Sequence, residues 1–173
     1  MTGLGANVAR SLCLTVIAAT AHAHGIHSAA ATFEDIAING SYIATSDGQW
    51  AKTNEVFHDE ATVTTTWTIT TSCTTAFDCA GQMSSDGGWN APIRYVSGLW
   101  FVTRTIDNWE QCADATTGPG MQTYKFYPDP AEPTRLIGWD STVGISGTCG
   151  INRPLVIDMP FRLVPTGASQ PQR

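Results

Sequence analysis

Thr62-Val63-Thr64-Thr65-Thr66-Trp67-Thr68-Ile69-Thr70 alternates in character at every second position. Val63, Thr65, Trp67 and Ile69 share one face, and the remaining positions put threonine on the other. A strict period of two with β-branched residues is typical of a half-buried antiparallel strand. The segment therefore predicts a strand whose Trp67 side faces the core and whose threonine face contacts solvent.

Similar patterns recur along the chain with turn sequences between them, such as Ser46-Asp47-Gly48 and Ser85-Asp86-Gly87-Gly88. Further strands are predicted at 40–45, 99–107, 121–127, 134–139 and 155–163. Pro160 has no N–H to donate, so it predicts a bulge or an unpaired edge in the last strand. Beyond residue 23 no segment keeps a helical period, so the predicted fold class is all-β.

The order of these segments suggests successive hairpins, that is, an antiparallel meander. We favour an up-and-down β-barrel of the lipocalin or avidin kind over a β-sandwich, because seven to nine short strands with frequent glycine turns fit either architecture but the meander fits a closed barrel better. The sandwich remains the alternative.

The amino-terminal 23 residues have the features of an export signal. Arg10 precedes an apolar run over 11–19 that is too short to span a bilayer, and Ala21-His22-Ala23 is a small-x-small cleavage site. We expect a secreted, extracytoplasmic protein whose mature chain begins at His24. The predicted domain organisation is a signal peptide at 1–23, a flexible lead-in at 24–35, one β domain at 36–165 and a disordered tail at 166–173.

Cysteine parity predicts two disulfides. Cleavage after residue 23 removes Cys13 and leaves four cysteines, an even number in an exported chain. Of the three possible pairings we favour Cys73–Cys79 and Cys112–Cys149. A metal site is the alternative, but the C-x5-C spacing does not match a zinc knuckle.

Charge and composition exclude several classes of partner. The chain has a formal net charge of -6, and Lys52 and Lys125 are its only lysines. Phosphate contacts need clustered basic residues, so we expect neither nucleic acid nor an anionic membrane surface as a partner. No second apolar run is long enough for a membrane segment.

Several longer segments together resemble a family of small exported proteins of mycobacteria and related actinobacteria. They are GSYIATSDGQWAKTNEVFHDEATVTTTWTITTSC, DCAGQMSSDGGW, NWEQC, GWDSTVGISGTCGINRPL and MPFRL. The resemblance runs from about Ile38 to Val164. It implies export, a single domain and the four-cysteine pattern, and it carries no activity or site residues with it.

Arg104 is the first candidate ligand-binding residue. It shares a predicted strand face with Trp100, Val102 and Ile106. If that face lines a barrel, Arg104 is an interior charge that needs a partner or binds a ligand group such as a carboxylate. If the face points outward, Arg104 is a surface cation. The opposite face is also apolar at its start, so periodicity leaves both readings open.

Trp89 and Trp109 are the other candidate ligand-binding residues, because both lie at predicted loop edges. Exposed at such edges, they would form a flat platform that stacks on sugar rings. The structural alternative is that they pack at the edge of the core.

A mature amino-terminal His24 raises a copper hypothesis. Its amine and imidazole, with a second imidazole from His58 or His27, would be similar to the histidine brace of lytic polysaccharide monooxygenases. No nucleophile elbow, phosphate loop or activated cysteine is present in the sequence.

The sequence therefore predicts a non-enzymatic exported β domain that binds a small or lipid-like molecule or a partner protein of the cell envelope. We expect no cofactor. A polysaccharide-binding module that uses exposed tryptophans, and a copper-binding protein with an amino-terminal histidine, are the alternatives.

Overall fold

The computed structural model describes residues 36–167, which contain ten strands and two short 3-10 helices. No helix in this range is long and apolar enough to cross a bilayer. The strands are β1 (Gly40–Ser46), β2 (Lys52–Thr53), β3 (Val56–Phe57), β4 (Val63–Thr75), β5 (Asp78–Ser85), β6 (Trp89–Val96), β7 (Leu99–Gln111), β8 (Thr117–Pro128), β9 (Leu136–Gly144) and β10 (Val156–Pro165). The helices are η2 (Gly48–Trp50) and η3 (Thr148–Gly150).

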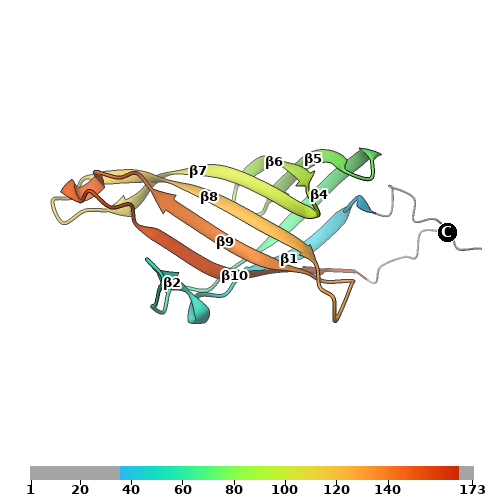
Figure 1. Ribbon diagram of the computed structural model, residues 1–173, viewed down its shortest axis with the longest axis horizontal. Helices are drawn as coiled ribbons and strands as arrows, with labels where there is room; N and C mark the ends of the chain where they lie inside the picture. The colour runs from blue at the N-terminus through green and yellow to red at the C-terminus, as the bar shows by residue number, and fades with distance from the viewer. Residues whose placement is uncertain (1–35, 168–173) are drawn as a thin grey trace, which may run out of the picture. The chain divides into compact units, whose positions relative to one another are not determined.

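Eight of these strands close into a barrel. Strands β4 to β10 each pair antiparallel with the next, and β1 pairs with both β4 and β10 (Figure 1). Because β1 joins the two ends of the meander, the barrel has no free edge along these strands. The predicted all-β fold and up-and-down barrel are therefore confirmed, and the sandwich alternative is wrong.

The link between β1 and β4 carries the small β2–β3 hairpin outside the barrel. β2 pairs with β10, where Thr53 lies opposite Ile157. Asn54 and Glu55 join the two short strands with φ of 50° and 72°. Two consecutive positive φ values are typical of a type I′ hairpin turn. The hairpin thus extends the sheet beyond the barrel at the end where β1 stops.

Pro160 lies where β10 changes its partner. Phe161 pairs with Ser46 of β1, whereas Asp158 pairs with Lys52 of β2. Between them the carbonyl of Pro160 accepts a hydrogen bond of 2.8 Å from the backbone N–H of Asp47. The missing N–H of Pro160 therefore falls at the break between the β1 and β2 ladders, while on its other side β10 keeps Pro160 in register with Trp139 of β9.

The inward faces of the strands meet in an aromatic layer around Trp67, which is 1% exposed. Its ring centroid lies 4.8 Å from Tyr124, 5.2 Å from Phe161, 5.5 Å from Trp89 and 6.4 Å from Phe126. Edge-on and tilted contacts at these distances add to the stability that burial provides. The layer fills the middle of the barrel.

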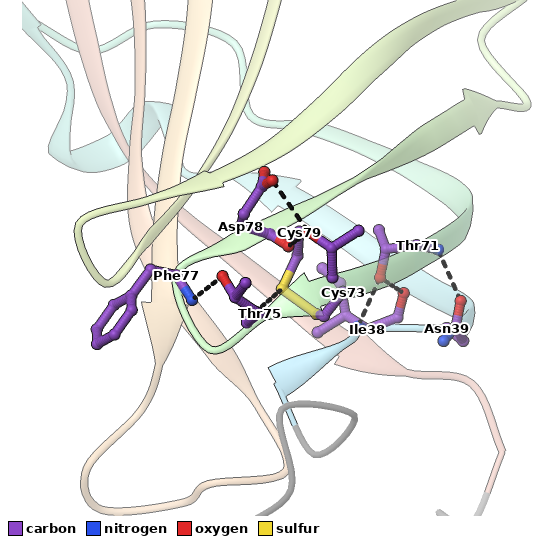
Figure 2. Close-up of a disulfide and its surroundings, with 9 residues drawn as sticks. Ile38, Asn39, Thr71, Cys73, Thr75, Phe77, Asp78 and Cys79 are labelled. Carbon is purple, nitrogen blue, oxygen red and sulfur yellow. Dashed lines mark hydrogen bonds between the residues drawn. A yellow bond between two sulfur atoms is a disulfide. The ribbon is translucent and has the colours of Figure 1, made fainter.

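Two disulfides tie the barrel, in the pairing favoured from the sequence. Cys73–Cys79 joins neighbouring strands of the β4–β5 hairpin (Figure 2). Close by, Thr71 holds the segment before β1: its hydroxyl bonds both backbone groups of Ile38 at 2.9 Å. Cys112–Cys149 joins the β7–β8 loop to η3, across 37 residues of sequence.

One strand boundary differs from the prediction in a way that matters below. The strand predicted at 134–139 is β9, which runs from Leu136 to Gly144. It begins later because it follows the proline-containing loop that ends β8, and it continues through Ser141, Thr142 and Val143, of which the last two are β-branched. Asp140 therefore lies inside a strand, not in a turn.

The predicted signal peptide, the lead-in, His24 and His27 lie outside the described residues, as does most of the predicted tail. These parts of the domain organisation stay predictions.

Candidate ligand-binding site

The barrel has a hollow at each end, and the two are similar in size. One, here called the polar-end pocket, has a volume of about 250 Å³ and is lined by Glu60, Ala61, Val63, Arg104, Ile106, Trp109, Gln122, Tyr124, Asp140, Thr142, Ile157 and Met159. The other, the apolar-end pocket, also measures about 250 Å³ and is lined by Ile36, Ile38, Tyr42, Tyr95, Trp100, Pro128, Pro133, Thr134 and Leu136.

Arg104 faces the barrel interior. It lies on the same face of β7 as the fully buried Trp100 and Val102, four and two residues before it, and it is half-buried itself. Its Nε donates a 2.7 Å hydrogen bond to Oε1 of Gln122 on β8, the residue opposite it in the ladder. Its guanidinium carbon lies 3.9 Å from the ring centroid of Trp89, a cation–π contact. The face that periodicity could not assign is thus the inner one.

A hydrogen-bonded chain continues from Gln122 across the barrel. The Gln122 Nε2 donates to the two carboxylate oxygens of Asp140, at 2.9 and 3.0 Å. Ser46, the last residue of β1, donates to Oδ2 of Asp140 at 2.7 Å. Asp140 is 1% exposed, so these bonds replace the water it has lost. Gln122 on β8, which accepts the hydrogen bond from Arg104, is thus held in place by Asp140 on β9, and Asp140 by Ser46 on β1.

Burial shapes the ionisation of this cluster. It raises the pKa of Asp140, against the opposing effect of hydrogen bonds from Ser46 and Gln122 and of the positive Arg104. Burial also raises the pKa of Tyr124, and the neighbouring Asp140 adds to the shift. Partial burial lowers the pKa of Arg104, opposed by Tyr124 and Asp140. An arginine stays protonated even so, because its ordinary pKa is far above neutral.

Arg104 keeps donors to spare. Within residues 36–167 the structure records no ion pair for Arg104, and its recorded hydrogen bond uses Nε. Its two terminal nitrogens, Nη1 and Nη2, have no recorded protein partner there. A half-desolvated cation of this kind gains from an anion that pairs with it.

Carboxylates also lie around the pocket. Oε1 of Glu60 accepts one hydrogen bond of 3.0 Å from the hydroxyl of Thr53 and also lies 3.0 Å from Nδ1 of His58. Glu110, at the same end but not lining the pocket, packs on Gly144 and has a buried Oε2 without a hydrogen-bond partner in the described range. The end as a whole thus mixes both signs of charge.

The two candidate tryptophans lie at this same end but are not exposed. Trp89 supports Arg104 and stacks on Tyr124, with centroids 6.1 Å apart and planes 11° from parallel. The ring of Trp109 covers Gly120 and Gly144, where a Cβ would come within 2.6 Å and 3.2 Å of it. Each ring packs against inward positions of the barrel, which agrees with the structural alternative given from the sequence.

The exposed tryptophans are Trp50 and Trp139, at 61% and 52%. Trp139 borders an open groove of about 380 Å³ on the outer wall of β9 and β10, together with Tyr127, Arg135 and Arg162. Arg135 is already paired with Asp129 and Glu132. This groove is larger than either end pocket but is open to solvent.

His58, the proposed second copper ligand, lies on the loop before β4 and is 66% exposed. Its Nδ1 lies beside Glu60. Across residues 36–167 no group of three or more metal-ligating side chains gathers. His24 lies outside this range, so the copper hypothesis stays a prediction without support from the described residues.

Sequence reasoning missed Ser46, Gln122 and Asp140. Ser46 falls in a predicted turn and Asp140 falls just beyond the strand predicted at 134–139, and short polar residues are common at such positions. The signal that could have found them is alternation: Ala44 and Ser46 share the inward face of β1, and Asp140 follows Leu136 at the spacing of two residues per repeat on β9. Gln122 shares the inward face of β8 with Gly120 and Tyr124, and its residue type alone does not indicate a buried polar position.

No protein-family model and no curated protein matches the chain. Among solved structures, the fold is similar to that of the M. tuberculosis PknI sensor domain. Its monomer form superposes with a TM-score of 0.57 at 17% identity, over 79% of this chain and 92% of that one. Its dimer form gives a TM-score of 0.50 at 21% identity, over 64% and 77%. At these identities the likeness shows a shared fold.

Proposed function

We propose that residues 36–167 form an extracytoplasmic, non-catalytic sensing domain that binds a small molecule in the polar-end pocket. The observation that carries the proposal is Arg104. It is half-buried beside a cavity of about 250 Å³, fixed through Nε and the ring of Trp89, and free of recorded partners at its terminal nitrogens among the described residues. Pockets with a few oriented polar groups among apolar walls are typical of ligand sites.

The extracytoplasmic location is supported by three independent features. Two disulfides persist in oxidising compartments and are rare elsewhere. A signal peptide at 1–23, as the sequence predicts, would direct export. The similar solved structures are described as a sensor domain from M. tuberculosis, which agrees with the family of exported proteins that the sequence resembles.

A binding role suits the polar-end pocket better than catalysis does. Its described lining holds no serine, cysteine or histidine, and the carboxylate of its Glu60 is engaged by Thr53 and His58. Asp140 is buried and bonded to Ser46 and Gln122, so it positions Arg104 and has little access to a substrate. The polysaccharide alternative has less support, because Trp89 and Trp109, the proposed sugar-stacking residues, are packed into the barrel.

The test compares two matched pocket-filling variants. Ala61→Phe blocks the polar-end pocket and Thr134→Phe blocks the apolar-end pocket; both positions are exposed at the rim, so neither change disturbs the core. A panel of small metabolites and lipids is titrated while intrinsic tryptophan fluorescence is recorded. We expect the wild type and Thr134→Phe to bind the same compound and Ala61→Phe to lose it.

Two results would contradict the proposal. Loss of binding in Thr134→Phe alone would move the ligand to the apolar end. A panel in which no compound binds the wild-type protein would argue for a structural domain without a ligand.

A further inference from the structure

We infer that the polar-end pocket takes a small monocarboxylate with an apolar body, whose carboxylate pairs with the two terminal nitrogens of Arg104. This inference rests on the proposed function, because it names the class of ligand for the same pocket. Charge, geometry and size each restrict that class.

Charge favours a single negative charge on the ligand. Arg104 is the only cation among the residues that line the pocket. Glu60 and Asp140 line the same pocket, and Asp140 accepts hydrogen bonds from Gln122. A doubly charged phosphate would meet one guanidinium and two carboxyl groups, whereas a monoanion is balanced by Arg104 alone.

Geometry favours a planar, two-oxygen partner. The hydrogen bond from Nε to Gln122 and the contact with Trp89 fix both the direction and the plane of the guanidinium. With Nε already used, the remaining fork is the pair Nη1 and Nη2. Two parallel N–H···O bonds from such a fork match a carboxylate, and little conformational entropy is lost because the side chain is held in advance.

Size and lining favour a short apolar body. Beyond its polar groups, the pocket is lined by Ala61, Val63, Ile106, Trp109, Ile157 and Met159. Its volume of about 250 Å³ is below the range of roughly 300–1,000 Å³ that holds drug-sized ligands. On its inner side the pocket ends at the aromatic layer around Trp67, of which its lining residue Tyr124 is a part. A long acyl chain would not fit, but a short-chain or single-ring acid does.

The experiment compares acids with their uncharged isosteres. Phenylacetate against phenylacetamide, and hexanoate against hexanamide, are titrated by calorimetry into wild type, Arg104→Gln, Arg104→Lys and Arg94→Gln. Arg94 is an exposed arginine of the outer wall, so its variant removes the same charge elsewhere. Inorganic phosphate is titrated as a further anion, and thermal unfolding of each variant verifies that it is folded.

We expect the wild type and Arg94→Gln to bind the acids, and the amides roughly tenfold more weakly or worse, as charged hydrogen bonds of this type predict. Arg104→Gln should reduce acid binding to the level of the amide. Arg104→Lys should recover part of the preference, because it keeps the charge and loses the fork.

The outcomes separate the two claims. Equal binding of acid and amide, with Arg104→Gln unchanged, overturns the carboxylate class and leaves a ligand-binding pocket. Tighter binding of phosphate than of either acid overturns the monoanion. If only uncharged compounds from the wider panel bind, and Ala61→Phe abolishes that binding, the proposed function stands and this inference fails. If nothing binds, both fail.

Discussion

The two ends of the barrel enclose hollows of equal volume, about 250 Å³ each, and they differ in the charged side chains on their walls. The apolar end is lined by aromatic, aliphatic and proline side chains and by Thr134, and no charged residue is among its described lining. The polar end presents Arg104 above a hydrogen-bonded chain that ends at Ser46. Volume therefore does not distinguish the two ends, and the proposal of the polar end rests on the guanidinium of Arg104.

The same four strands build both ends. A step of four residues along each one replaces a large buried side chain by a polar one: Tyr42 by Ser46 on β1, Trp100 by Arg104 on β7, Phe126 by Gln122 on β8 and Leu136 by Asp140 on β9. Four residues are two repeats of a strand, so both members of each pair point inward. The polar cluster is thus built into the inner wall of the sheet and does not depend on loops.

The largest expected effect is a loss of stability when the packing of the apolar end is disrupted. Trp100 is 1% exposed, and Trp100→Ala leaves a large void beside Tyr95, whose ring lies 5.2 Å away. We expect the free energy of unfolding to fall by about 3–5 kcal/mol. Ligand binding at the polar end should change less than about twofold in the folded fraction, since distant sites act independently. Urea unfolding and calorimetry measure the two quantities.

Each end also has its own disulfide, and the two should differ in strength. Cys112–Cys149 spans 37 residues and Cys73–Cys79 spans 6. In the loop-entropy description, replacing the first pair by alanine costs about 4 kcal/mol and replacing the second about 2 kcal/mol. Chemical denaturation of the two double variants checks the order. A larger loss from the shorter loop would mean that the β4–β5 hairpin stabilises more than its own closure.

A smaller effect is expected at the polar end when Gln122, the hydrogen-bond partner of Arg104, is replaced. Gln122→Leu removes the acceptor of Arg104 Nε and a donor to Asp140. Leaving these groups without partners should lower the free energy of unfolding by about 1–3 kcal/mol and weaken ligand binding as Arg104 loses its orientation. Gln82→Leu, an exposed position of β5, is the matched control and should change both by little. If Gln122→Leu is neutral for binding, Gln122 does not position Arg104.

The smallest effect is a pH dependence centred on Asp140. Its pKa in the folded protein is raised above the ordinary 3.8, so the native state holds this proton more tightly than the unfolded chain. The resulting stabilisation is complete below about pH 3.8 and is lost as pH rises through the raised pKa. In Asp140→Asn this loss is absent.

The check is the difference in unfolding free energy between Asp140→Asn and wild type, measured at steps from about pH 4 to pH 8. The difference should move in favour of Asp140→Asn as pH rises. Taking the difference removes groups of opposite sign, such as Asp129, whose pKa the bond from Arg135 lowers. A difference that is flat with pH would mean that Asp140 keeps an ordinary pKa.

Much of the scaffold could be predicted from the sequence, because it depends on period-two patterning. Strict alternation around Trp67 gave a strand with the correct inner face, and cysteine parity together with loop position gave the disulfide pairing. The candidate site was harder. β7 is apolar on both faces at its start, so alternation alone could not say that Arg104 points inward; only closure of the sheet decides that.

The polar cluster itself escaped prediction for a physical reason. Ser46 and Asp140 are residue types that favour turns, and their burial is compensated by partners on other strands. That compensation depends on register, which a single sequence does not reveal. Trp89 is the first residue of β6 and Trp109 lies near the end of β7, and both rings pack onto inward positions of the barrel, a choice that the sequence left open.

We propose that the polar end, and not the apolar end, receives the ligand. A nuclear magnetic resonance titration of the labelled protein with phenylacetate, followed at side-chain signals of both ends, tests this most directly. We expect Arg104 Nε–H, the Gln122 amide and the Trp109 indole to shift together and saturate, while the Trp100 indole stays in place. Saturating shifts at Trp100 or at the outer-wall Trp139, with Arg104 unchanged, would contradict it.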